Sequence, residues 1–172
     1  MTSEAERLTL VLVGPMAAGK TSVGRRVARK LGIPFIDTDK RVVAAHGPIP
    51  AIFAEFGESH FRELERDAVA AALSEGGVVS LGGGAVTDEG TRALLRKHPV
   101  VFLTVTPEAV ADRIAGGGRP LLEGEDPVGR WTRIFEARRG WYEDVASTTF
   151  DTSRRPMHRI AEEIAAWRRE QA

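Results

Sequence analysis

The sequence predicts an α/β fold in which a five-stranded parallel sheet carries helices on both faces. Short apolar segments alternate with longer segments of helical pattern along the chain, and this alternation is typical of βαβ units. The apolar segments are rich in valine and leucine and end at glycine or aspartate, as expected for strands buried on both faces. Ligands of such sheets bind beyond the carboxyl ends of the strands, so these glycine and aspartate clusters mark the predicted site.

The first predicted strand and helix are joined by a glycine-rich turn. Residues 8–13 form a run rich in leucine and valine that stops at Gly14. A helical pattern follows over about residues 19–31, where apolar side chains recur every four positions. Gly32 and the nearby Pro34 end this helix, because glycine favours the position after a helix and proline cannot continue one.

The remaining elements keep the same alternation. Proline opens three of the later helices, at positions where its missing N–H is not needed. Further strands are expected at about residues 34–36, 77–81, 100–105 and 148–151. Further helices are expected at about residues 58–74, 88–97, 107–115, 127–145 and 156–169, with one or two more between residues 39 and 56 that are interrupted by a turn at residues 47–50. The polar, glycine-rich residues 114–126 are predicted to form a mobile lid.

Composition limits the classes of protein to which the chain can belong. Its 172 residues suffice for one domain with a hydrophobic core. Lysine plus arginine and aspartate plus glutamate both number 24, which is not the balance of a nucleic-acid-binding protein. The absence of cysteine excludes disulfides and thiolate metal sites. Because residues 1–7 lack the pattern of a secretory signal and no apolar run suits a membrane helix, we expect a cytoplasmic monomer that binds neither membrane nor nucleic acid.

Residues 14–21 contain a phosphate-binding motif. They read G-P-M-A-A-G-K-T and fit the pattern G-x-x-x-x-G-K-[ST]. In such a loop backbone N–H groups surround the phosphates, and the following helix adds its positive end. Lys20 is then placed to reach the β- and γ-phosphates of ATP, and the Thr21 hydroxyl to bind Mg²⁺. This pattern also arises by chance in turns, but here it follows a predicted buried strand and opens a predicted helix, which favours phosphate binding.

Two aspartates follow the second predicted strand, in the sequence Asp37-Thr38-Asp39. At this edge of the sheet they are expected to lie near the phosphates and their metal ion. One carboxylate can hold the water shell of Mg²⁺, and the other can orient an attacking hydroxyl and accept its proton. The alternative is structural: Asp37 ends a strand and Asp39 caps a helix. The neighbouring phosphate motif favours the functional interpretation.

Six segments occur in one order along almost the whole chain. They are GPMAAGKTSVG at residues 14–24, FIDTD at 35–39, IFAEFGESHFRELE at 52–65, SLGGGAV at 80–86, RPLL at 119–122 and ARRGWY at 137–142. Together they resemble the shikimate kinases, small P-loop kinases of the nucleoside-monophosphate-kinase type. The resemblance implies a P-loop NTPase fold with a substrate-binding segment at about residues 38–66. It also implies the Mg²⁺-dependent transfer of a phosphoryl group from ATP to the 3-hydroxyl of shikimate, a step of aromatic amino acid biosynthesis.

The resemblance also implies a role for each motif residue. The acceptor is bound by Asp39, Arg62, Gly82, Gly83, Gly84 and Arg138. ATP is bound by Gly14, Ala17, Ala18, Gly19, Lys20, Thr21, Ser22, Arg113, Arg119, Arg155 and Pro156, of which Arg113 and the Arg155-Pro156 pair flank the adenine. Mg²⁺ is held by Thr21, by Asp37 through water, and by Ser80 from behind that water shell. Lys20, Asp39 and Arg119 are the implied catalytic residues, with Arg119 entering from the lid.

Departures from the family pattern leave alternatives open. Ala17 stands where the family commonly has glycine, which matters only if this position needs a positive φ. Residues 47–50 read Gly-Pro-Ile-Pro where the family typically has Gly-x-Ser-Ile, and this edge of the acceptor site could admit gluconate or a cyclitol instead of shikimate. Arg139 could replace its neighbour Arg138, although alignment on Tyr142 favours Arg138. A third class, an ATP sensor without catalysis, is disfavoured by the retained aspartates.

Overall fold

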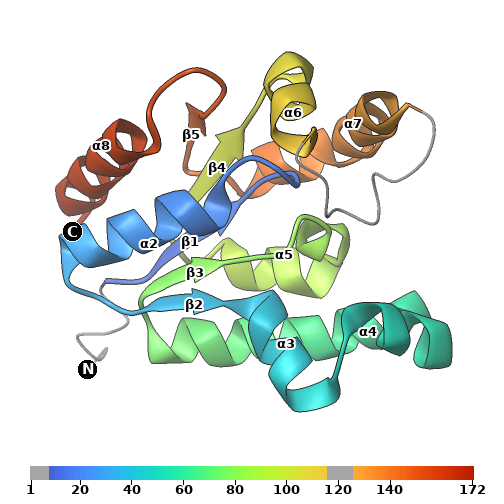
Figure 1. The fold of residues 1–172 in the computed structure, drawn as a ribbon. Coiled ribbons are helices and arrows are strands. Elements are labelled where there is room, and N and C mark those ends of the chain that lie inside the picture. Colours follow the sequence, from blue (N-terminus) through green and yellow to red (C-terminus); the bar gives the residue numbers. More distant parts are fainter. Residues whose placement is uncertain (1–7, 116–125) are drawn as a thin grey trace.

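A sheet of parallel strands forms the centre of the fold (Figure 1). The computed structural model describes residues 8–115 and 126–172. Within these residues five strands lie in the order β2-β3-β1-β4-β5, and every neighbouring pair is parallel. The strands are β1 (Leu10–Val13), β2 (Phe35–Asp37), β3 (Val78–Ser80), β4 (Val100–Thr104) and β5 (Thr148–Asp151). The predicted fold class and the parallel five-stranded sheet are confirmed.

Helices cover both faces of this sheet. α2 and α8 lie on one face, and α4, α5 and α7 lie on the other (Figure 1). The helices are α2 (Lys20–Leu31), α3 (Thr38–His46), α4 (Ile49–Glu75), α5 (Glu89–Leu95), α6 (Pro107–Ile114), α7 (Pro127–Val145) and α8 (Met157–Glu170), with a short 3₁₀ helix, η1 (Ala85–Thr87). Most predicted bounds agree with these within two residues. No helix in the described part of the chain is long and apolar enough to cross a bilayer.

The hydrophobic core fixes the helices from which the predicted site residues project. β1 is buried along its whole length, together with Val23 and Val27 of α2. On the other face Phe102 of β4 lies with its ring centroid 6.3 Å from that of Phe135 and 5.1 Å from that of Tyr142, both in α7. Burying one such side chain stabilises the fold by about 1.5–3 kcal/mol. These contacts fix α7 relative to the sheet.

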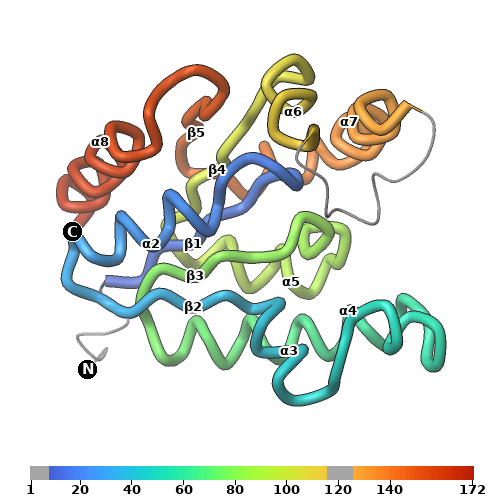
Figure 2. Tube along the Cα trace, in the orientation of Figure 1, coloured from blue at the N-terminus to red at the C-terminus, as the bar shows by residue number. Residues whose placement is uncertain are grey.

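α3 and the first half of α4 extend beyond the sheet next to β2, and the second half of α4 runs back along the sheet (Figure 2). The predicted interruption near residues 47–50 is present: α3 ends at His46 with Gly47 as its C-cap, and Pro50 lies in the first turn of α4. The helices expected on the two sides of residue 57 form one element, α4, with a kink at Gly57. Its φ of 85° and ψ of 171° are accessible to glycine without steric cost, so the chain can bend and resume the helix.

The predicted lid falls almost wholly outside the described residues. α6 ends at Ile114, and the described chain resumes at Asp126, whose side chain caps α7 by accepting a hydrogen bond from the Gly129 N–H at 3.0 Å. Arg119, expected to act from this lid, lies in the part that is not described.

Candidate active site

The phosphate loop joins β1 to α2 at the carboxyl end of the sheet. Gly14 has a φ of 153°, and a β-carbon built on it would lie 2.3 Å from the backbone oxygen of Leu103, so only glycine fits. Ala17 adopts a φ of 68°. This position therefore does need a positive φ, and an L-residue there costs about 1–2 kcal/mol. α2 begins at Lys20, which places its N-terminal N–H groups at the loop.

Lys20 folds over the loop that precedes it. Its Nζ donates to the carbonyl oxygens of Gly14 at 2.7 Å and Pro15 at 2.9 Å. The ammonium group is thereby held at the mouth of the loop, where a bound triphosphate places its negative oxygens. Thr21 follows in the first turn of α2, with an exposed side chain.

Asp37 is both the last residue of β2 and the cap of α3. Its Oδ1 accepts a hydrogen bond from the Lys40 N–H at 3.2 Å. The helix-capping role that the structural alternative gave to Asp39 falls to Asp37, and Asp39 lies in the first turn of α3. Asp37 is in register with Ser80, the buried last residue of β3. The two strand ends therefore bring a carboxylate and a hydroxyl to the same edge of the sheet.

Asp39 lies against the turn that follows β3. A β-carbon built on Gly82 would lie 2.7 Å from both carboxyl oxygens of Asp39, so the absent side chain of Gly82 makes room for this carboxylate. Burial raises the pKa of Asp39, the neighbouring Asp37 raises it further, and Lys20 and Arg62 partly oppose the shift. A raised pKa makes the ionised carboxylate a stronger proton acceptor.

The glycines at 83 and 84 receive two guanidinium groups. A β-carbon built on Gly84 would lie 2.4 Å from Nη2 of Arg62, and one on Gly83 would lie 3.7 Å from Nη1 of Arg138. Arg62 comes from α4 and Arg138 from α7, so two helices far apart in the sequence converge on one turn. With Asp39, this turn gathers one carboxylate and two cations beside the phosphate loop.

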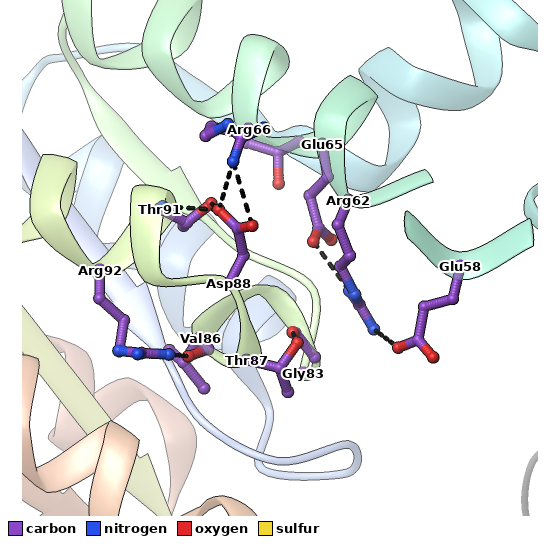
Figure 3. Close-up of polar contacts among 12 residues, drawn as sticks. Glu58, Arg62, Glu65, Arg66, Gly83, Val86, Thr87, Asp88, Thr91 and Arg92 are labelled. Carbon is purple, nitrogen blue, oxygen red and sulfur yellow. Dashed lines mark hydrogen bonds and ion pairs between the residues drawn. The ribbon is translucent and has the colours of Figure 1, made fainter. Parts of the chain in front are cut away.

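Arg62 is fixed by two carboxylates of its own helix (Figure 3). Its Nη1 lies 2.8 Å from Oε1 of Glu65, and its Nη2 lies 3.2 Å from Oε1 of Glu58. The guanidinium carbon also lies 5.1 Å from the ring centroid of Phe61. Among the described residues, its buried Nε has no hydrogen-bond partner. Buried polar atoms are usually paired, so this orphaned donor is consistent with a ligand or water completing the site.

Glu65 is a buried carboxyl group beneath Arg62, only 1% exposed. Burial raises its pKa to about 7; Arg62 opposes the shift, and the charges of Asp39 and Asp88 add to it. Between pH 4.5 and about 7 the folded protein therefore keeps a proton that the unfolded chain has lost. Stability falls as pH rises through this window and the penalty is complete above it.

We expect Glu65→Gln to remove this pH dependence. The wild-type free energy of unfolding should fall by up to about 3 kcal/mol between pH 5 and pH 8 on account of Glu65, and the variant should lack that part of the slope because glutamine does not ionise. Urea unfolding of the ligand-free proteins at both pH values measures the difference. Equal slopes for the two proteins would show that Glu65 does not hold its proton in this window.

Tyr142 supports the turn at residues 82–84 through a hydrogen bond to its backbone. It is almost fully buried, and its hydroxyl donates to the carbonyl oxygen of Gly83. Burial raises the pKa of Tyr142 to about 12, outweighing the lowering by its hydrogen-bond partner Arg138 and by Arg62. The phenol stays protonated at physiological pH and serves as a fixed donor.

The neighbouring Arg139 faces elsewhere. Its Nη2 lies 3.0 Å from Oε1 of Glu136, and its guanidinium carbon lies 4.8 Å from the ring centroid of Phe135. Arg138 and Arg139 thus occupy different faces of α7, and Arg138 is the one beside the triple glycine.

The residues expected around the adenine do not join this cluster. Arg113 donates through Nη1 to the carbonyl oxygen of Ala17 at 2.6 Å, so it lies on the outer side of the phosphate loop. Arg155 is paired with Glu163, and Pro156 caps the start of α8.

Comparison with known proteins identifies the family. The family model described as shikimate kinase matches residues 16–168. The chain belongs to the shikimate kinase family. The shikimate kinase of Corynebacterium efficiens is 44% identical over 160 residues, covering 92% of this chain and 95% of that protein. The shikimate kinase of Salinispora arenicola is 48% identical over 159 residues, covering 91% and 95%.

Solved structures agree with this membership. The shikimate kinase of Acinetobacter baumannii, solved in complex with shikimate, superposes with a TM-score of 0.88 and 33% identity, covering 99% of this chain and 98% of that one. A gluconokinase from Sinorhizobium meliloti gives a TM-score of 0.66 at 21% identity, covering 98% and 95%, and that likeness concerns the fold alone. The resemblance inferred from the six motifs is therefore confirmed.

The donor set suits the hydrated Mg²⁺ that a kinase family implies. In the described parts of the chain no three histidine, aspartate or glutamate side chains gather as a dedicated metal cage. Mg²⁺ usually keeps several waters and binds one or two protein oxygens plus the phosphates of its substrate. Thr21 at the start of α2, and Asp37 and Ser80 on neighbouring strand ends, are oxygen donors of this kind.

A further layer of polar contacts behind the triple glycine was missed by the sequence analysis. Asp88 caps α5 by accepting from the Thr91 N–H at 2.8 Å, and it also binds Nη1 of Arg66 at 3.1 Å (Figure 3). Arg92 donates to the carbonyl oxygen of Val86 at 2.7 Å. Asp88 before a predicted helix could have signalled a cap, but its second partner on α4 lies 22 residues away. These contacts tie α4 to the turn that the site residues share.

Proposed function

We propose that this member of the shikimate kinase family transfers the γ-phosphoryl group of ATP to the 3-hydroxyl of shikimate, giving shikimate 3-phosphate and ADP. One observation carries the assignment of the acceptor: a carboxylate and two guanidinium groups converge on three consecutive glycines next to a phosphate loop. Shikimate is a carboxylated ring with several hydroxyls, and that set of groups matches its chemistry. The A. baumannii enzyme, solved with shikimate, shares this fold over nearly its full length.

The acceptor is held by Arg62, Arg138 and Asp39. The two guanidinium groups come from two helices, α4 and α7, and suit a carboxylate, which accepts paired hydrogen bonds from arginine. Gly82, Gly83 and Gly84 let the ring approach the backbone. Asp39 orients the attacking hydroxyl and accepts its proton as the oxygen–phosphorus bond forms. Its raised pKa favours this transfer.

ATP is held by the phosphate loop. Backbone groups of Gly14, Ala17, Ala18 and Gly19 surround its phosphates, with Lys20, Thr21 and Ser22 at the start of α2. Thr21 would hold Mg²⁺ directly, with Asp37 and Ser80 acting through its waters, and the ion would supply positive charge to the phosphates. Arg113, Arg155 and Pro156 flank the adenine, and Arg119 supplies positive charge from the lid at residues 114–126 during transfer.

We further propose that residues 1–172 act as a single catalytic domain. Residues 38–66, which span α3 and the first half of α4, form the acceptor-binding segment. The protein works as a cytoplasmic monomer without nucleic acid or membrane. Size-exclusion chromatography with light scattering tests the monomer: a dimer at micromolar concentration would reject it.

One observation supports a second class of acceptor, gluconate or a cyclitol. Gly47, the C-cap of α3, has a φ of 90° and a ψ of −176°, and the prolines at the start of α4 lie in the acceptor segment, where the sequence departs from the family pattern. A coupled ADP-release assay with Mg²⁺ and shikimate, quinate, gluconate and several cyclitols decides between them. Turnover that requires shikimate supports the proposal, whereas turnover with another acceptor and none with shikimate rejects it.

We expect Gly84→Ala to weaken acceptor binding selectively. The new methyl group would meet Arg62 Nη2 at 2.4 Å, and displacing a guanidinium that binds a carboxylate should raise the KM for shikimate about tenfold, since a charge-assisted hydrogen bond contributes about 1.5–3 kcal/mol. The KM for ATP should stay nearly unchanged. Initial-rate kinetics with each substrate varied separately measure both constants.

Gly140→Ala is the matched control. A β-carbon there would have no neighbour within 4 Å, so the substitution should leave both KM values unchanged and stabilise α7 by about 0.5–1 kcal/mol. A Gly84→Ala enzyme with wild-type KM for shikimate would contradict the placement of Arg62 in the acceptor site.

A further inference from the structure

Side chains from outside the phosphate loop bind its carbonyl groups. Nε1 of Trp131, in α7, donates to the carbonyl oxygen of Met16 at 2.8 Å. The hydroxyl of Thr152, which directly follows β5, lies 2.7 Å from the carbonyl oxygen of Ala18. Both side chains are almost completely buried, so each contact is shielded from competition by water.

Arg113 binds both the phosphate loop and Thr152. From α6 its Nη1 reaches the carbonyl oxygen of Ala17 at 2.6 Å and the hydroxyl oxygen of Thr152 at 3.3 Å, and its Nη2 donates to the carbonyl oxygen of Thr152. Thr152 can therefore accept from Arg113 while its single hydroxyl proton goes to the carbonyl oxygen of Ala18 at 2.7 Å, the nearer of its two acceptors, the other being that of Thr104 at 3.3 Å. Three consecutive carbonyl groups of the loop, those of residues 16–18, are thus bound by side chains from α6, α7 and the end of β5.

Peptide planarity converts these carbonyl contacts into a constraint on the N–H groups. In a trans peptide the C=O and the following N–H point in opposite directions from one plane, and the described residues contain no cis peptide bond. Fixing the carbonyl of Met16 therefore aims the N–H of Ala17 to the other side. Fixing the carbonyl of Ala18 likewise aims the N–H of Gly19. These N–H groups belong to the concavity that receives phosphate oxygens.

The constraint is needed because the loop backbone is strained. Ala17 has a φ of 68°, a conformation that costs an alanine about 1–2 kcal/mol. With glycine the same conformation would cost almost nothing. An alanine at this position relaxes to a negative φ unless its surroundings hold it, and that relaxation would turn the neighbouring peptide planes.

We propose that Trp131 and Thr152 are positioning residues for ATP: through the carbonyl groups of Met16 and Ala18 they hold the loop N–H groups in their phosphate-binding orientation. Neither side chain touches the nucleotide in this role. The inference rests on the proposed function only in taking residues 14–21 as the ATP phosphate site. It predicts a loss of nucleotide affinity with little loss of shikimate affinity.

Isosteric variants test the proposal. Thr152→Val keeps the shape and loses the hydroxyl, and Trp131→Phe keeps an aromatic ring and loses the N–H. Each leaves a buried carbonyl unpaired, and we expect each to raise the Kd for Mg·ADP, measured by isothermal titration calorimetry, about five- to tenfold, with a like rise in the KM for ATP. The KM for shikimate should change less than about twofold. Thr152→Ser retains the hydroxyl and should restore affinity.

Two controls make the same chemical changes elsewhere. Thr149→Val lies on an exposed position of β5 and Trp141→Phe on a partly exposed position of α7, and both should leave nucleotide binding unchanged. Unchanged Kd for Mg·ADP in Thr152→Val and Trp131→Phe would overturn the proposal, as would equal changes in the constants for both substrates. If Thr152→Val does not fold, Trp131→Phe decides alone. Calorimetry with Mg·ADP needs no acceptor, so it tests this proposal even if shikimate is not the acceptor. In that case the wild-type enzyme would bind Mg·ADP without phosphorylating shikimate.

Discussion

Lys20→Ala is expected to lower kcat by about 10²–10³-fold, the loss typical of removing one preorganised donor to developing charge. The ammonium group lies within 2.9 Å of two carbonyl oxygens of the loop that is proposed to hold the triphosphate. During transfer, negative charge grows on the oxygen that bridges the β- and γ-phosphates, and the proposed function makes Lys20 a fixed cation beside it. Stopped assays of ADP formation with saturating ATP and shikimate measure the change.

Lys30→Ala is the matched control for this prediction. Lys30 lies in the last turn of the same helix, α2, and its Nζ is 3.7 Å from Oε1 of Glu162 on the protein surface. Exposed ion pairs contribute about 0–1 kcal/mol, so the control should keep wild-type kinetics. A Lys20→Ala enzyme that keeps full ATP-dependent phosphorylation would contradict the whole account of residues 14–21 as the phosphate loop.

The sheet and the phosphate loop were predictable because their signals are local. Residues 10–13 are apolar without interruption, and the glycine and lysine positions that follow have a fixed spacing, so no distant contact is needed to recognise them. The break at residue 57 was also predicted, but the sequence did not show that the helix resumes beyond Gly57 as part of the same element. The resemblance to a family supplied the acceptor residues, which pattern alone did not.

The remaining part of the site depends on contacts between distant segments. Nothing near Trp131 in the sequence indicates that its N–H binds the carbonyl of Met16, 115 residues away. The same holds for Thr152 and Ala18, which are 134 residues apart. A motif shows which residues form a loop, whereas the contacts that hold its peptide planes come from other elements and appear only once the chain is folded. The positive φ of Ala17 is a further example. The sequence showed only that alanine would be costly if this position needed a positive φ, and the folded backbone shows that it does.

Arg138→Ala is expected to raise the KM for shikimate about 30- to 100-fold, with the KM for ATP almost unchanged. The guanidinium group lies at Gly83 beside the phosphate loop, and losing a charged hydrogen-bond donor to a carboxylate costs about 1.5–3 kcal/mol. Arg139→Ala is the control one residue away: it loses the exposed ion pair with Glu136 and the contact with the Phe135 ring, both away from the triple glycine, and should keep wild-type KM values. Varying shikimate at saturating ATP measures both variants.

Arg138→Ala and Arg139→Ala together also decide which of the two arginines binds the acceptor, a question that the sequence left open. Because adjacent residues of a helix point about 100° apart, only one of the two arginines can reach the triple glycine. A large rise in KM for Arg139→Ala with none for Arg138→Ala would show that α7 is turned by one residue from the arrangement described.

Tyr142→Phe separates direct binding of the acceptor by Arg138 from support of the glycine turn. It removes the hydroxyl that donates to Gly83 but leaves the Arg138 charge in place, so its effect on the KM for shikimate should be much smaller than that of Arg138→Ala. Equal effects would mean that Arg138 acts by holding Tyr142 and the glycine turn, and that Arg62 alone binds the carboxylate.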